Sequence, residues 1–70
     1  MPDSTYKIIE LVGTSENSWE EAAKNAIQDA SASLKEMRVA EVSKLDMKIE
    51  NGKVMNFRTR LSVSFKYEKS

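Results

Sequence analysis

The stretch that decides the fold reads RVAEVSKLDMKIENGKVMNFRTRLSVSFKY and runs over residues 38–67. Near its middle, Asn51 and Gly52 separate two segments that are rich in β-branched and apolar residues. Both residues tolerate the positive φ angles of a type I′ turn, and an Asn-Gly pair in this setting is a strong hairpin signal. The sequence therefore predicts two long antiparallel strands, over 38–50 and 53–67, joined by a two-residue turn.

The second of these strands alternates strictly between two faces. One face is expected to carry Phe57, Thr59, Leu61, Val63, Phe65 and Tyr67, and the other Asn56, Arg58, Arg60, Ser62, Ser64 and Lys66. The first strand keeps the same alternation near the turn, but Val39 is out of step with Ala40 and Val42. We therefore predict one β-bulge or bend near Ser43 and Lys44, which would re-aim the strand.

Length and composition set the class of protein. Seventy residues predict a single domain over 1–70, with loose tails at 1–4 and 68–70. Cysteine and histidine are both absent, which removes the thiolate nucleophile and the commonest general base, so we expect a protein that is not an enzyme. Eleven basic residues balance eleven acidic ones, and this favours neither nucleic acid nor a membrane as partner. The sequence shows no membrane span or signal peptide, which favours a cytoplasmic protein.

The first part of the chain predicts one strand and one helix. Residues 5–12 form the expected strand, which has apolar side chains on both faces, and Gly13-Thr14-Ser15 is expected to end it. Residues 18–36 form the expected helix, in which Ser18 and Glu21 make a reciprocal capping box. The apolar stripe of this helix consists of Trp19, Ala22, Ala23, Ala26, Ile27, Ala30, Leu34 and Met37. We expect Trp19 to pack in the core or in an interface.

The resulting element order is β-α-β-β, an α+β fold. One helix is too little to cover three strands, two of which are long. A core of this size rarely gives a wide stability margin without disulfides or metals, so we expect the chain to form oligomers.

Several segments together resemble the dodecin family. They are Tyr6-Lys7, Glu10-Leu11-Val12-Gly13-Thr14-Ser15, Ser18-Trp19-Glu20-Glu21-Ala22, Val39-Ala40-Glu41-Val42 and Val63-Ser64-Phe65. The resemblance implies a three-stranded antiparallel sheet wrapped around one helix. It also implies assembly into a hollow homo-dodecamer that binds flavins in stacked pairs between subunits and stores them.

At the family's flavin site, this sequence resembles the subtype that lacks the flavin-stacking tryptophan. Val39 stands where that tryptophan would be, and Arg58 stands where a glutamine would hydrogen-bond the ring. Valine offers no aromatic face, and arginine donates hydrogen bonds but accepts none. By this resemblance the residues of the small-molecule site are Val39, Arg58, Lys44, Asp46, Lys48 and Lys66.

Two functions therefore remain open from the sequence. The first is storage of a flavin (riboflavin, FMN or FAD) or of a related nucleotide such as coenzyme A. The second is a structural or metal-binding shell that does not bind flavin, with a calcium or magnesium ion held by Glu41 and Asp46. Arg58 and Arg60 project from one face, where they would either pair with Glu41, Asp46 or Glu50 or form a rim that binds anions.

Overall fold

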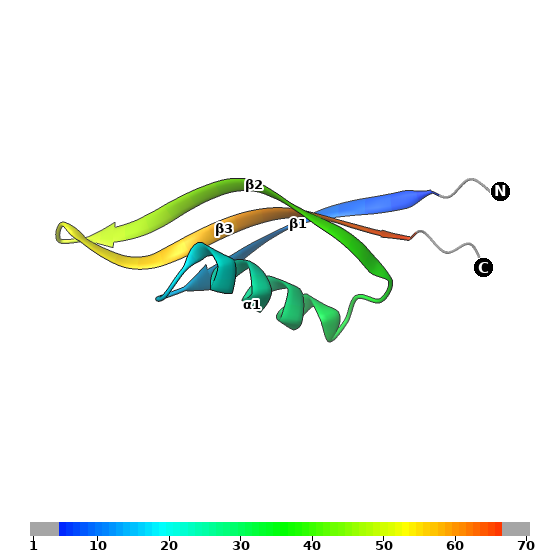
Figure 1. Cartoon of the computed structure of the whole chain (residues 1–70), viewed down its shortest axis with the longest axis horizontal. Coiled ribbons are helices and arrows are strands. Elements are labelled where there is room, and N and C mark those ends of the chain that lie inside the picture. The colour runs from blue at the N-terminus through cyan, green and yellow to red at the C-terminus, as the bar shows by residue number, and fades with distance from the viewer. Residues whose placement is uncertain (1–4, 67–70) are drawn as a thin grey trace.

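The computed structural model describes residues 5–66 as three strands and one helix. The elements are β1 (Tyr6–Ser15), α1 (Trp19–Ser31), β2 (Met37–Glu50) and β3 (Lys53–Lys66). The strands form one antiparallel sheet in the order β1-β3-β2, and α1 lies across one of its faces (Figure 1). This is the predicted β-α-β-β arrangement of the α+β class. The predicted tails, 1–4 and 68–70, and Tyr67 lie outside the described residues.

The hairpin between β2 and β3 is confirmed. Asn51 and Gly52 have φ angles of 52° and 75°, both positive, as a type I′ turn requires. The predicted slip is present as a shift in the register between Val42 and Lys44. Two further shifts, after Met37 and after Lys48, were not predicted. These irregularities let β2 bend along β3 instead of following it as a straight ladder.

The first strand is longer than predicted. Gly13-Thr14-Ser15 does not end it, because β1 continues to Ser15 and pairs there with Phe57 of β3. Gly13 is needed for close packing and not for a turn. A Cβ atom at this position would collide with the carbonyl oxygen of Ala22 and would lie 2.9 Å from the Cβ of Ala26. The absence of a side chain at Gly13 is what allows α1 to lie directly on β1.

The helix is shorter than predicted, because it ends at Ser31 and not near residue 36. The Ser31 hydroxyl donates to the carbonyl of Gln28 at 2.7 Å, a local hydrogen bond that competes with helical continuation. The chain then tightens into a turn, where the amides of Ser33 and Leu34 both donate to the Ala30 carbonyl. Leu34 therefore lies after the helix, and Met37, which the predicted stripe also included, begins β2.

The helix N-terminus is where it was predicted, but only half of the capping box forms. The Ser18 hydroxyl accepts a hydrogen bond from the Glu21 amide at 3.0 Å. The Glu21 carboxylate does not return to Ser18, because it accepts hydrogen bonds from the Ser15 hydroxyl at 2.8 Å and from the Asn17 amide at 3.0 Å. Because β1 extends as far as Ser15, the Ser15 hydroxyl lies close enough to donate a hydrogen bond to the Glu21 carboxylate.

The core is small and lies between α1, β1 and β3. Its buried members are Ala22 and Ala26 of the helix and Leu61 and Val63 of the central strand. Apart from its first residue, Met37, every position of β2 is exposed, because the helix covers the other two strands. The molecule measures 53 × 21 × 15 Å, so it is a thin, elongated body with one face of β2 uncovered. The helix is neither long nor apolar enough to cross a membrane.

Replacing Gly13 by alanine tests the close contact between α1 and β1. The added methyl group would push the helix off the strand, and overpacking of this kind costs about 1–3 kcal/mol. We expect a lower urea midpoint for Gly13→Ala, measured by circular dichroism on the assembled protein. Thr14→Ala is the matched control, since Thr14 is exposed and its neighbour in the same strand. Equal midpoints for the two variants would show that the helix does not approach β1 this closely.

Candidate functional site

The site residues predicted from the sequence share one surface, the face of the sheet that points away from α1. We call it the outer face. On β3, residues such as Thr59 and Leu61 point toward the helix and are buried, so the residues between them point away from it. Directly paired residues on antiparallel strands project to the same side, so the β2 partners of these outward residues lie on the outer face as well. The outer face carries Val39, Glu41, Lys44, Asp46 and Lys48 from β2 and Arg58, Arg60 and Lys66 from β3.

Arg58 and Asp46 form a bidentate ion pair on this face. Nε of Arg58 lies 2.7 Å from Oδ1 of Asp46, and a terminal guanidinium nitrogen lies 3.2 Å from Oδ2. The hydrogen bond from Arg58 lowers the pKa of the Asp46 carboxyl, and the same bond raises the pKa of Arg58. Both side chains are about half exposed. Of the three acidic partners that the sequence offered for Arg58, the structure pairs it with Asp46, and the pair engages both carboxylate oxygens and the guanidinium fork.

Val39 lies far from this pair within one subunit. Its partner on β3 is Ser64, whereas the partner of Asp46 is Arg58. Six residue positions along β3 separate the two places, roughly 20 Å at the usual rise of a strand. The structure therefore does not bring Val39 and Arg58 together, and a ligand that touches both would have to lie between subunits.

The residues predicted to hold a metal do not meet within one subunit either. Glu41 is paired with Ser62 and Asp46 with Arg58, four positions or roughly 13 Å apart along the strand. Asp46 is also engaged by Arg58. Over residues 5–66, no group of three or more Asp, Glu, His or Cys side chains is placed to hold a metal ion.

The lysines of the predicted site have different surroundings. Lys48 lies 3.5 Å from the carboxylate of Glu50. Lys66 is paired with Tyr6 at the far end of the sheet. Lys44 lies directly opposite Arg60, which places two positive charges side by side on the outer face.

Trp19 is a packing residue, as predicted. Its ring meets Phe57 edge to face at a centroid distance of 4.9 Å. Its indole N–H donates to the Asp46 carbonyl at 3.0 Å, and its own carbonyl accepts from the buried Thr59 hydroxyl at 2.8 Å. Trp19 thereby ties the start of α1 to the middle of β2 and β3, on the side of the sheet opposite the Arg58–Asp46 pair.

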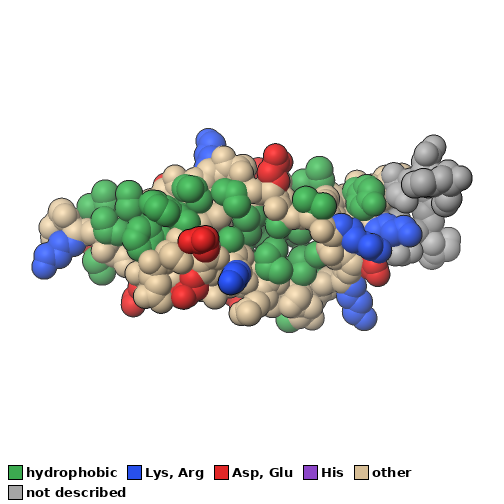
Figure 2. Space-filling view, in the orientation of Figure 1, with side chains coloured by type: hydrophobic (Ala, Val, Ile, Leu, Met, Phe, Trp, Pro, Cys, Tyr) green, Lys and Arg blue, Asp and Glu red, His purple; other side chains and the backbone are tan. Residues whose placement is uncertain are grey.

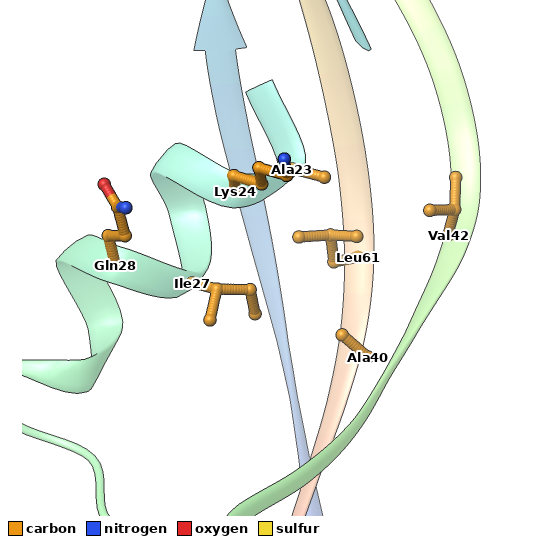
Figure 3. Close-up of a pocket in the computed structure, with 7 residues that line it drawn as sticks. All are labelled: Ala23, Lys24, Ile27, Gln28, Ala40, Val42 and Leu61. Carbon is orange, nitrogen blue, oxygen red and sulfur yellow. The ribbon is translucent and has the colours of Figure 1, made fainter. Parts of the chain in front are cut away.

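An apolar groove runs between α1 and β2. It consists of two adjoining hollows of about 310 and 410 Å³, and Ala23, Lys24 and Val42 line both. Figure 3 shows Ala23 and Ile27 of the helix facing Leu61 and Val42 across this gap. Figure 2 shows hydrophobic side chains gathered along the hairpin and beside the helix on the same side of the molecule. The groove exists because α1 covers β1 and β3 but stops short of β2.

A second hollow, which the sequence did not predict as a site, lies at the turn between β1 and α1. We call it the turn cavity. It has a volume of about 350 Å³ and is lined only by polar residues, namely 14–17, Glu21, Asn25 and Asn56. The signal in the sequence was the Glu16-Asn17 pair before the helix, but Asn25 and Asn56 reach the cavity only through the fold.

The comparisons with known proteins agree with one another. The Dodecin family model matches residues 5–68. Calcium dodecin of Mycobacterium tuberculosis is 44% identical over 63 residues, which cover 90% of this chain and 89% of the relative.

Solved structures give the same result. The dodecin of Streptomyces coelicolor superimposes with a TM-score of 0.92 at 34% identity over the whole of both chains. The calcium dodecin structure from M. tuberculosis, which is described as having a calcium-binding site, superimposes with a TM-score of 0.82 at 46% identity and covers 96% of each chain. On its sequence and its fold, the chain belongs to the dodecin family.

Proposed function

We propose that this protein is a dodecin-type binding and storage protein that forms a homo-dodecameric shell and is not an enzyme. We further propose that its ligand is a divalent cation, most of all calcium, and not a flavin. The observation that carries the proposal is the chemistry of Val39 and Arg58, the two residues at the position where the family binds flavin. Val39 is 62% exposed and has no aromatic face, and the guanidinium of Arg58 is held by Asp46. The calcium dodecin of M. tuberculosis, at 44% identity in the sequence comparison and 46% in the comparison with its solved structure, supports the same ligand.

Assembly follows from the uncovered half of the sheet. Val42 and Leu45 of β2 are 50% and 53% exposed in the isolated subunit, and both line the apolar groove. Apolar side chains in such a groove are stabilised when a second molecule removes them from water. The protruding hairpin adds further exposed apolar side chains, among them Ile49 and Val54. Neighbouring subunits would cover these surfaces and enclose the ligand sites.

A second candidate function is storage of a phosphorylated nucleotide such as FMN, FAD or coenzyme A. The observation that favours it is the cross-strand pair of Lys44 and Arg60. Like charges directly opposite each other destabilise a sheet unless an anion lies between them. A phosphate group is suited to that position, because a guanidinium and an ammonium bind it well.

Light scattering tests the assembly. The wild-type protein should have a mass close to twelve times that of the 7.9 kDa chain. Val42→Arg places a charge in the groove, where a neighbour would have to bury it, so this variant should dissociate or form smaller species. Lys35→Glu is the control, since Lys35 is an exposed residue in the turn after the helix. A wild-type protein that remains a monomer would refute the shell.

Flavin titration tests the ligand. Wild-type protein should quench riboflavin fluorescence weakly, because no aromatic ring is present at position 39. In Val39→Trp/Arg58→Gln, the stacking face and the paired donor and acceptor return, and quenching should rise above the sum of the single variants. Because the two positions are far apart in one subunit, this gain should appear only in the assembled protein.

Two results of that titration would count against the cation proposal. Tight riboflavin binding by the wild type would show that flavin storage does not need the aromatic face. A clear preference of the wild type for FMN over riboflavin would support the nucleotide function, and Lys44→Gln should then remove that preference.

A further inference from the structure

Asp46 holds Arg58 in the way that an anionic ligand would. The direct neighbours of Arg58 across the sheet are Asp46 on β2 and Thr14 on β1, and only Asp46 carries a charge. Its two carboxylate oxygens lie 2.7 and 3.2 Å from two nitrogens of the guanidinium. A guanidinium binds a carboxylate and a phosphate in the same bidentate geometry. Asp46 therefore occupies the position that a phosphate bound to Arg58 would take.

The backbone that carries Asp46 is fixed from the other side of the sheet. The indole N–H of Trp19 donates to the main-chain carbonyl of Asp46 at 3.0 Å, and the Trp19 ring packs edge to face on Phe57, which precedes Arg58 in β3. An ion pair between directly opposite residues on fixed strands loses little conformational freedom when it forms. We therefore expect the Arg58–Asp46 pair to persist, although both side chains are about half exposed.

Two further cations lie next to the pair on the outer face. Arg60 is two positions from Arg58 along β3, and Lys44 lies directly opposite Arg60. Neither Arg60 nor Lys44 forms an ion pair with any residue in the range 5–66. The hydrogen bond from Arg58 is the main cause of the lowered pKa of Asp46, and the charge of Arg60 lowers that pKa further. A single carboxylate thus acts on a group of three cations.

Other carboxylates of the outer face are placed differently. Glu10 of β1 and Glu41 of β2 both lie opposite Ser62, and neither is directly opposite a cation. In the described part of the chain neither of them forms an ion pair. The removal of the Asp46 charge would therefore leave the guanidinium of Arg58 without a bound anion, beside two cations that already have none.

We propose that Asp46 determines the charge of the ligands that the outer face accepts, because its carboxylate acts as an internal anion for Arg58 and keeps phosphate-bearing ligands away. The inference rests on that part of the proposed function which excludes flavins. An anion that belongs to the chain competes at a high effective concentration, whereas a free phosphate loses translational and rotational freedom when it binds. A neutral residue at position 46 would open an anion site formed by Arg58, Arg60 and Lys44.

A comparison of FMN with riboflavin tests the inference, because the two ligands share a ring system and differ by one phosphate. In fluorescence titrations of the assembled protein, the wild type should bind both with the same weak affinity. Asp46→Asn keeps the size of the side chain and removes its charge. Its affinity for FMN, and not for riboflavin, should rise about tenfold, as expected for charge-assisted hydrogen bonds to a phosphate. Calorimetry with inorganic phosphate, which needs no contact to a ring, should show the same gain.

Two variants serve as controls. Glu50→Gln removes a carboxylate from the same strand, where it lies 3.5 Å from Lys48, and changes the net charge by the same amount. It should bind FMN and phosphate as the wild type does. Asp46→Asn/Arg58→Gln should lose the gain of the single variant, because the fork that binds the phosphate is removed.

The fold of each variant can be checked independently. The hydrogen bond from Trp19 goes to the main-chain carbonyl of residue 46, so a change of the Asp46 side chain should leave the Trp19 emission spectrum as it is. Light scattering should return the mass of the wild-type assembly. Asp46→Ser replaces Asp46→Asn in the titrations if the asparagine variant does not assemble.

The outcomes separate this inference from the proposed function. An assembled variant with a neutral residue 46 that binds phosphate no more tightly than the wild type would overturn the inference, as would an equal gain in Glu50→Gln. A wild type that already prefers FMN to riboflavin as strongly as Asp46→Asn would also overturn it. If the wild type binds no calcium, the cation function fails, but a gain of phosphate binding in Asp46→Asn would still support the role of Asp46.

Discussion

The contact of α1 with β1 at Gly13 is the constraint on which the rest of the structure depends. No side chain at this position would fit beneath the Ala22 carbonyl, and the helix meets the sheet there through Ala22 and Ala26, both buried. Small residues on both sides let the backbones approach closely. The close approach also brings Ser15 to Glu21 and Thr59 to the Trp19 carbonyl, so the start of the helix is fixed by hydrogen bonds to two strands.

That same contact determines what is left uncovered. A helix that lies so close to β1 and β3 contacts β2 mainly through Trp19 at its start, and β2 keeps its apolar residues in water along almost its whole length. The core of one subunit, with two alanines, one leucine and one valine as its buried apolar members, gives little stabilisation by itself. Burial of β2 against neighbours is the physical reason for the proposed shell. Assembly would complete the hydrophobic core as well as form the ligand sites.

The two proposed ligands, a flavin and a calcium ion, require different chemical groups from the protein. A flavin requires a planar aromatic partner and matched donors and acceptors, and the outer face offers a valine and an arginine that already has a carboxylate partner. A calcium ion requires several oxygen ligands and a negative charge, but no aromatic face.

The sequence alone determined the hairpin, the element order, the helix start and the family, because each rests on local signals: the Asn51-Gly52 turn, strict alternation in β3, and a serine cap. It gave Asp46 only as one of three possible partners of Arg58, because the register shift after Lys48 that places the two residues opposite each other was not predicted. It failed for the end of β1 and the end of α1, where Gly13 and Ser31 serve tertiary packing and a local hydrogen bond. Only the tertiary structure decided the separation of Val39 from Arg58 and the place of Asn56 on the lining of the turn cavity. Strand register and the position of the helix on the sheet set these distances, and no local pattern contains them.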